Sequence, residues 1–222
     1  YEDAGTLFEP DFEKLNKLKP DVILIGGRTA AVYDELKKIA PTIQTSIDTT
    51  KYAESFDENA KIIGQIFGKS AEVEAELAAI HAASEQLKGK AESAGKTLVI
   101  LTTGGKISAY GPGSRFGIIH DVLGFAPVDT TIEASTHGQS ISNEFILEKN
   151  PDILFVIDRD AVVSGEGGGK TAKDVVENEL IKQTNAYKNG KIVYLDPSYW
   201  YLSGGGLVSG AEMVKEAAAA VQ

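Results

Sequence analysis

The sequence contains no cysteine, which excludes disulfide bonds and thiolate metal sites and leaves the redox compartment open. No apolar run approaches the length that a membrane-spanning helix needs. Positive charge is also scarce, because 22 Lys and Arg stand against 32 Asp and Glu and give a net charge of −10. A chain this acidic is poorly suited to bind nucleic acid or an anionic membrane surface.

What remains is the composition of an ordinary globular protein. Hydrophobic residues make up 42% and charged residues 24% of the 222 positions, which allows one large domain or two small ones with an ample core. The chain starts at Tyr1, without an initiator methionine or a signal peptide. We therefore expect a processed or trimmed chain, whose targeting segment would lie outside this sequence.

A helix–Pro-Asp–strand–Arg pattern occurs twice. One copy is KPDVILIGGR at residues 19–28, and the other is NPDILFVIDRD at residues 150–160. Each follows a short amphipathic segment, and its apolar, β-branched run is typical of a strand buried on both faces. The duplication predicts two similar α/β lobes, each with one Arg at a strand end, where open α/β sheets place ligand-binding residues.

Arginine is far rarer than lysine in this chain. Only Arg28, Arg115 and Arg159 are present, and all three are predicted at strand ends or in glycine-rich turns. The planar guanidinium group suits bidentate contacts with anionic oxygens. Three ordinary surface ion pairs would also explain these residues, but their placement favours a shared anionic ligand.

Periodicity and turn residues predict alternating helices and strands. Helices are expected at 12–18, 30–39, 52–67, 70–94, 116–123, 143–148, 172–184 and 211–221. Strands are expected at 22–25, 42–47, 97–102, 106–110, 153–157 and 191–195, and an aromatic, glycine-rich loop at 197–206. We expect Ser70 and Ser114 to cap the helices that follow them. The long helix from residue 70 suits a rigid connector between two α/β halves.

Residues 164–171 read SGEGGGKT and look like a phosphate-binding loop between a strand and a helix. Ser164 stands where that motif needs its first glycine, and no later strand ends in an acidic residue that would hold Mg²⁺. A solvated loop is the better interpretation. A nucleotide-dependent enzyme that uses this loop stays open as an alternative.

Two further side chains have the chemistry of iron ligands. His137 lies in a loop of small residues, and Tyr201 ends a row of three aromatic residues after the last predicted strand. No Ser-His-Asp order or zinc-ligand spacing accompanies them. An imidazole nitrogen and a phenolate oxygen are donors compatible with Fe³⁺. Because two protein ligands cannot fill an octahedron, a chelating small molecule would have to supply the other four.

Three segments carry a resemblance to a known family. They are THGQSISNEFILEKNPD (136–152), GPGSRFGIIHDVLG (111–124) and YLDPSYWYL (194–202). With these motifs, the chain resembles over its whole length the periplasmic siderophore-binding proteins, which are the substrate-binding subunits of ABC iron importers, in the branch of the enterobactin (enterochelin) and petrobactin type. The resemblance implies a binding protein and not an enzyme. Such a protein captures a ferric catecholate siderophore and delivers it to a membrane permease.

The resemblance also implies an α/β fold of two lobes joined by a single long helix. The N-terminal lobe would occupy residues 1–69, the connecting helix residues 70–95, and the C-terminal lobe residues 96–222. Members of the family have further strands and helices before the position that matches Tyr1. The first lobe is therefore expected to be incomplete, with a sheet edge or an apolar face uncovered.

Carried over by motif, His137 and Tyr201 would complete the coordination of iron when the siderophore supplies four oxygens. Arg28, Arg115 and Arg159 would surround the anionic complex. No intrinsic cofactor is implied, since Fe³⁺ arrives as the siderophore complex. The family is periplasmic or lipid-anchored at the outer face of the cell membrane. A binding protein for another iron chelate or for haem stays open as a second alternative.

Overall fold

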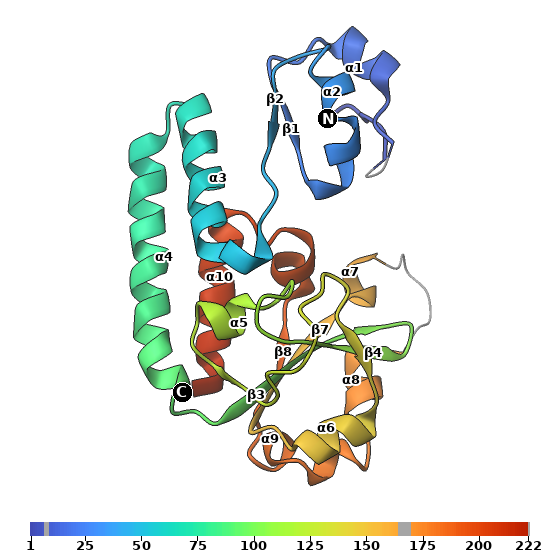
Figure 1. Ribbon diagram of the computed structural model, residues 1–222, viewed down its shortest axis with the longest axis vertical. Coiled ribbons are helices and arrows are strands. Elements are labelled where there is room, and N and C mark those ends of the chain that lie inside the picture. Colours follow the sequence, from blue (N-terminus) through green and yellow to red (C-terminus); the bar gives the residue numbers. More distant parts are fainter. Residues whose placement is uncertain (7–8, 164–169, 222) are drawn as a thin grey trace. The chain divides into compact units, whose positions relative to one another are not determined.

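The computed structural model describes residues 1–6, 9–163 and 170–221. The chain folds into two compact units, which we call unit 1 (residues 1–47) and unit 2 (residues 48–222). Both contain helices and strands (Figure 1), and the expected α/β fold class is confirmed. Residues 48–69, which we expected in the first lobe, pack with unit 2. The division into lobes at residues 69 and 95 stays a prediction.

Unit 1 is organised around a parallel pair of short strands. Its elements are α1 (Phe12–Leu18), β1 (Ile23–Ile25), a 3-10 helix (Gly27–Val32), α2 (Tyr33–Leu36) and β2 (Thr42–Gln44). The Asp11 side chain caps α1, as an acceptor for the backbone N–H of Lys14 at 3.0 Å. Leu15, Ile25 and Leu36 form the buried core of the unit. The helix expected at 30–39 is α-helical only in α2, since its first turns are a 3-10 helix.

Unit 2 is built around a mixed sheet. The strands described in it are β3 (Lys96–Thr103), β4 (Lys106–Tyr110), β5 (Ala126–Pro127), β6 (Gln139–Ile141), β7 (Ile153–Asp158) and β8 (Ile192–Leu195). They are ordered β6-β4-β3-β7-β8, with β5 beside the start of β3. Strands β3, β7 and β8 run parallel, so their carboxyl ends meet at one edge. The candidate site lies at this edge, as expected for an open α/β sheet.

Helices pack around the sheet of unit 2 and on one another (Figure 1). Those described are α3 (Tyr52–Ile66), α4 (Ser70–Ala91), α5 (Ile118–Asp121), α6 (Asn143–Lys149), α7 (Asp160–Val163), α8 (Ala172–Val176), α9 (Asn185–Lys188) and α10 (Leu207–Ala218). Leu98, Leu154 and Val156 pack in one core cluster with residues of α6, α8 and α9. Val99 and Phe155 alternate with them and are equally buried, so the central strands are covered on both faces.

The long helix expected from residue 70 is present as α4, and it ends at Ala91 rather than Ala94. Its apolar stripe, which includes Val73 and Leu87, is buried, and the helix packs against α3 and α10 (Figure 1). Ser70 does not cap the helix, because it is the first helical residue and no side-chain cap is formed. Whether α4 connects two lobes stays a prediction.

Two expected helices are shorter than their periodicity suggested. At 116–123 only α5 is α-helical, and Ser114 donates its hydroxyl to the Gly111 carbonyl instead of capping it. At 172–184 the helix stops after α8. The Asn178 side chain accepts hydrogen bonds from the backbone N–H groups of Leu180 and Ile181, at 3.0 and 3.3 Å. Such local side-chain bonds compete with the helical ones and turn the chain.

The duplicated pattern is confirmed at the level of the backbone. Helices α1 and α6 both end at a left-handed residue directly before proline, Lys19 with φ 50° and Asn150 with φ 43°. Each donates its backbone N–H to the carbonyl four residues earlier. Among the described residues, no other non-glycine residue has a positive φ. The two copies therefore use the same cap to pass from helix to strand.

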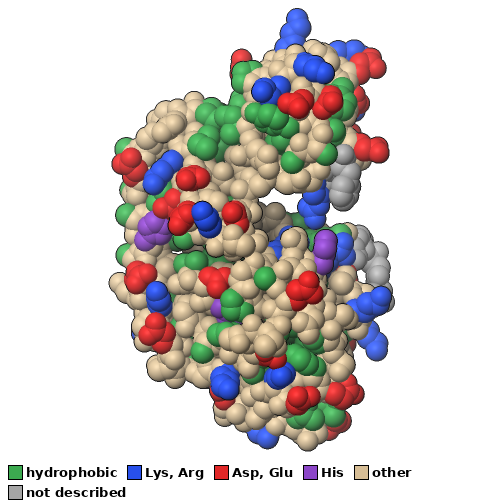
Figure 2. Space-filling view, viewed as in Figure 1, with side chains coloured by type: hydrophobic (Ala, Val, Ile, Leu, Met, Phe, Trp, Pro, Cys, Tyr) green, Lys and Arg blue, Asp and Glu red, His purple; other side chains and the backbone are tan. Residues whose placement is uncertain are grey.

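Charges of both signs are mixed at the surface. On the visible face of unit 2, acidic and basic side chains are interspersed (Figure 2). Among the helices of the described ranges, none combines the length and the apolarity needed to cross a membrane.

Candidate functional site

Two of the three arginines meet at Tyr201. Arg159 directly follows β7, and Tyr201 lies in a turn after the neighbouring strand β8. The Arg159 Nε donates to the Tyr201 hydroxyl at 2.8 Å. Arg115, from the loop after β4, donates its Nη2 to the Tyr201 carbonyl at 2.6 Å. Its guanidinium carbon also lies 4.1 Å from the centre of the Tyr201 ring, a distance at which a cation is attracted to the ring face.

The turn that presents Tyr201 is π-helical and not the loop that the sequence predicted. It spans Ser198–Leu202, and the backbone N–H of Ser203 donates to the Ser198 carbonyl at 3.1 Å. Trp200 anchors it, since its ring is only 3% exposed and its Nε1 donates to Glu216 on α10 at 2.8 Å. Trp200 is therefore a core residue. Single π-helical turns inside proteins occur frequently at functional sites.

The arginines change the acidity of the site's phenols. Burial opposes ionisation of Tyr201, but the Arg159 hydrogen bond and the charges of Arg115 and Arg159 outweigh burial and hold its pKa below the ordinary 10.0. Burial raises the pKa of the nearby Tyr110 phenol to about 12, although the Arg115 charge acts in the opposite direction. Tyr201 is thus the easier of the two to deprotonate, as binding to Fe³⁺ requires.

Two residues of the cluster were missed by the sequence reasoning. Arg159 Nη1 donates to the Thr103 hydroxyl at 3.1 Å and lies 3.7 Å from the Asp160 carboxylate. Thr103 and Asp160 are also joined to each other at 2.9 Å. A signal was available, since Thr103 was expected just past a strand end and Asp160 directly follows the singled-out Arg159. Pattern alone did not show that the ends of β3 and β7 are adjacent.

His137 lies in a loop that packs on the same cluster. Its neighbour Gly138 has φ 73°, and an added Cβ would lie 2.7 Å from the Tyr110 ring. The backbone N–H of Arg115 donates to the Ser135 carbonyl in this loop at 3.4 Å. The His137 side chain is exposed, and its role as an iron ligand stays a prediction. Across the described ranges, no three His, Asp or Glu side chains gather in a way that suits a metal ion.

Arg28 belongs to unit 1. It lies in the 3-10 helix just after β1, so its expected position near a strand end is confirmed, and its side chain is exposed. Its predicted participation in a site shared with Arg115 and Arg159 stays a prediction.

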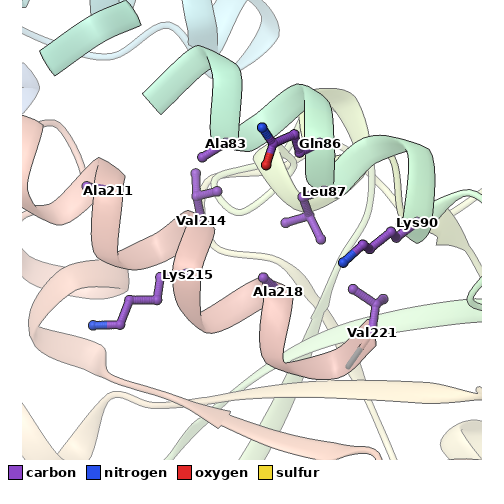
Figure 3. Close-up of a pocket in the computed structure, with 9 residues that line it drawn as sticks. All are labelled: Ala83, Gln86, Leu87, Lys90, Ala211, Val214, Lys215, Ala218 and Val221. Atoms are coloured by element: carbon purple, nitrogen blue, oxygen red, sulfur yellow. The ribbon is translucent and has the colours of Figure 1, made fainter. Parts of the chain in front are cut away.

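Two surface pockets in unit 2 lie away from these residues. One, of about 430 Å³, lies between α4 and α10 and is lined by Leu87, Val214 and Ala218, with Lys90 at its margin (Figure 3). The other, of about 530 Å³, is polar and lies beside α6 and α8. Neither includes any of the expected site residues.

The glycine-rich segment 164–171 falls largely outside the described residues, which resume at Lys170. Thr171 is described, and it caps α8 in a reciprocal arrangement. Its hydroxyl accepts from the Asp174 backbone N–H at 3.2 Å, and the Asp174 carboxylate accepts from the Thr171 backbone at 3.0 Å. A capping box explains a Thr at this position without a bound nucleotide.

Comparison with known proteins places this arrangement in a family. A family model described as periplasmic binding protein matches residues 3–199. The chain belongs to the periplasmic binding protein family. It is 52% identical over 217 residues to the petrobactin-binding protein YclQ of Bacillus subtilis, covering 97% of this chain and 68% of that protein. It is 38% identical over 212 residues to the ferric-anguibactin-binding protein FatB of Vibrio anguillarum, covering 93% of this chain and 65% of that protein.

Solved structures show the same fold. The crystal structure of YclQ superimposes with a TM-score of 0.93 at 50% identity, over 100% of this chain and 77% of that one. The catecholate-siderophore binding protein VctP of Vibrio cholerae gives a TM-score of 0.92 at 37% identity, over 99% of this chain and 78% of that one. The chain thus spans about two thirds of the length of the curated relatives and about three quarters of these solved chains.

Proposed function

We propose that the chain is the substrate-binding component of an ABC importer that captures ferric catecholate siderophores. The observation that carries the proposal is the convergence of Arg115 and Arg159 on Tyr201, at the carboxyl edge of β3, β7 and β8. In this cluster two guanidinium cations contact a phenol whose pKa is lowered. The cluster suits a ligand that is anionic and carries an Fe³⁺ ion. The names of the related proteins, which bind petrobactin, ferric anguibactin and catecholate siderophores, support the same ligand class.

The proposed role of each residue follows from the charge of the complex and from the coordination number of iron. An Fe³⁺ held by two catecholates carries a net charge of −1, and by three a net charge of −3, since each catecholate brings two negative charges. Arg115 and Arg159, together with Arg28 from unit 1, would compensate either complex. His137 and Tyr201 would coordinate iron only when the chelator leaves two sites open. The proposed ligand site therefore contains five residues, of which Arg28 and His137 are included on the sequence motifs alone.

Transport and location are part of the proposal. A protein of this kind releases its ligand to a membrane permease and performs no chemical reaction on it. It would act in the periplasm, or from a lipid anchor at the outer face of the cell membrane.

A fluorescence titration tests the proposal. Trp200 is the only tryptophan of the chain, and it directly precedes Tyr201, so a ligand at the cluster should quench its emission. We expect saturable quenching by ferric bis- and tris-catecholates, with dissociation constants at or below roughly 1 μM. N-acetyltryptophanamide, titrated in parallel, corrects for absorption by the ferric complexes, and an Arg115→Gln variant should bind each complex more weakly.

The alternatives give different results in the same experiment. Saturable quenching by haem or by ferric citrate, without a response to catecholates, would identify another iron carrier. Stabilisation against heat by nucleotides, again without a catecholate response, would point to the glycine-rich segment and to an enzyme. Either result overturns the proposal.

A further inference from the structure

Arg159 is held by three groups of unit 2, the Tyr201 hydroxyl, the Thr103 hydroxyl and the Asp160 carboxylate. The direction in which the Thr103 hydroxyl donates is fixed by its neighbours. The guanidinium Nε donates to Tyr201, and Nη1 donates to Thr103 Oγ1 at 3.1 Å. Guanidinium is only a donor, so the Thr103 oxygen must act as acceptor in that bond. The single hydroxyl proton of Thr103 is then directed to Asp160 Oδ1, 2.9 Å away, because an ionised carboxylate can only accept. The order of donation is therefore Arg159 to Thr103 to Asp160.

Asp160 is in turn fixed to the backbone. Its second carboxylate oxygen, Oδ2, accepts from the backbone N–H of Gly104, in the turn between β3 and β4. Its own backbone N–H donates to the Asp158 carboxylate at 3.1 Å. Asp160 thus joins the tip of the β3–β4 hairpin to the first turn after β7. These bonds give Thr103 a rigid support on which the long Arg159 side chain rests.

Of the guanidinium nitrogens of Arg159, Nη2 has no hydrogen-bond partner among the described residues, and the side chain is 34% exposed. An unsupported arginine would adopt many rotamers and would lose that freedom on binding an anion, at a cost of the order of 1–2 kcal/mol. Because the Thr103 bond already restricts the Arg159 side chain, much of this rotamer freedom is lost before the ligand binds. Nη2, with its two N–H groups, is left as a donor for a ligand.

We propose that Thr103 is a positioning residue for anion binding, which acts through Arg159 and is itself oriented by Asp160. The proposal rests on the proposed function, because it assumes that Arg159 contacts the ferric chelate. It adds a residue that touches neither the anion nor the metal. Thr103 would contribute equally to binding of four-oxygen and six-oxygen chelates, since Arg159 responds to charge and not to the number of open coordination sites.

A double-mutant cycle tests the proposal. Thr103→Val keeps the shape of the side chain and every formal charge, and we expect it to weaken binding of both chelate classes about 5–10-fold. Thr103→Ser keeps the hydroxyl and should bind within about 2-fold of the native chain. In the Arg159→Gln background, Thr103→Val should have no further effect, because the two residues act as one unit. Additive losses, or a Ser variant as weak as Val, would overturn the positioning role.

The matched control is Thr131→Val. Thr131 makes the same kind of bond, to Asp129 at 2.7 Å. It lies near the start of β3, where the backbone N–H of Val128 donates to the Thr97 carbonyl, and thus at the end of that strand opposite to Thr103. We expect unchanged binding. A loss as large as that of Thr103→Val would show that any broken Thr–Asp bond disturbs the unit, and would overturn the specific role of Thr103.

A measurement without ligand separates this proposal from the proposed function. The chain has only three arginines, so their guanidinium groups give few signals in a ¹H–¹⁵N NMR spectrum at low temperature, and Arg159→Gln identifies the relevant ones. The Nε–H keeps its bond to Tyr201, so the Nη–H groups report on Thr103, which accepts from Nη1. We expect the Arg159 Nη–H groups to exchange with water at least about 3-fold faster in Thr103→Val, and at the native rate in Thr103→Ser and Thr131→Val. Faster exchange in a chain that binds no ferric chelate would refute the function but leave the positioning intact. Unchanged exchange in Thr103→Val would refute the positioning whatever the ligand.

Discussion

Replacing Tyr201 by Phe should separate ligands by the number of oxygens they offer to iron. A four-oxygen chelate leaves two coordination sites, and the Tyr201 phenolate is proposed to fill one of them. Without it, water takes its place, and we expect affinity to fall at least about 10–100-fold, the loss seen when even a supporting residue of a metal site is removed. A six-oxygen chelate leaves no open site and should lose nothing from this cause.

Tyr201→Phe can affect six-oxygen chelates through the lost hydrogen bond between Tyr201 and Arg159. In the native chain the Tyr201 hydroxyl occupies Arg159 Nε at 2.8 Å, and a bond with a charged partner contributes roughly 1.5–3 kcal/mol. That bond exists before any ligand arrives, so its loss destabilises the unliganded chain and frees a donor for the anion, while the bond to Thr103 still positions Arg159. Six-oxygen chelates should therefore bind Tyr201→Phe within about 3-fold of the native chain, or more tightly.

The assay is a Trp200 fluorescence titration with both chelate classes, accompanied by visible absorption spectra. Phenolate bound to iron produces a charge-transfer band, which the native chain should show with four-oxygen chelates and Tyr201→Phe should lack. Tyr199→Phe, in the same π-helical turn, is the matched control and should keep both the band and the affinity. His137→Ala should likewise weaken four-oxygen chelates and spare six-oxygen chelates, and it removes neither hydrogen bond of Arg159. Equal losses for both chelate classes in Tyr201→Phe would show that the ring packs against the ligand without coordinating iron.

Three further outcomes are expected. In a pH titration followed by tyrosinate absorbance, the first ionisation step should disappear in Tyr201→Phe, because the pKa of Tyr201 is depressed in the folded chain. Ionisation of Tyr201 therefore stabilises the fold above pH about 10, the ordinary pKa of tyrosine. This stabilisation is lost as the pH falls through the folded pKa. In chemical denaturation, Gly138→Ala should lower the free energy of unfolding by about 1–3 kcal/mol more than Gly190→Ala. Both glycines have a positive φ, but only a Cβ on Gly138 would meet the Tyr110 ring. Equal losses would place the strain in the backbone alone. Leu36→Ala should lower the free energy of unfolding by about 2–5 kcal/mol, since Leu36 is 1% exposed. Hydrogen exchange should accelerate in residues 1–47 while the β3 and β7 amides keep their protection. Uniform acceleration would contradict a separate core in unit 1.

Much of the fold could be predicted from the sequence because its signals are local. Strand 106–110 and helix 12–18 have the expected bounds, since a turn or a cap marks each end. The errors occur where a side chain competes with the backbone for hydrogen bonds. Asn178 ends a helix whose apolar period continues, and Ser114 bonds to the Gly111 carbonyl before a helix that it was expected to cap. Periodicity reports which face is buried and not whether the backbone remains helical.

The site could be predicted only in part for a different reason. Arg159, Arg115 and Tyr201 stand out by rarity, by motif and by their positions near strand ends, and the structure brings them together. Thr103 and Asp160 are common residue types, and their part in the cluster depends on β3 and β7 being neighbours in register. Strand order is a tertiary fact that no local pattern specifies. The supporting residues of a site are therefore harder to foresee than those that contact the ligand.

The duplication itself shows where sequence equivalence ends. Lys19 and Asn150 have the same left-handed cap, and the same Pro-Asp follows each. Beyond the strands the copies diverge, because Arg28 enters a 3-10 helix after Gly26-Gly27, whereas Arg159 comes directly after β7 and is bound by Thr103 and Tyr201. The repeat carries each arginine to a strand end but does not give it the same surroundings. If both bind the ferric chelate, Arg159 does so from a position held by a hydroxyl and a phenol, and each replacement must be judged by the contacts of its own copy.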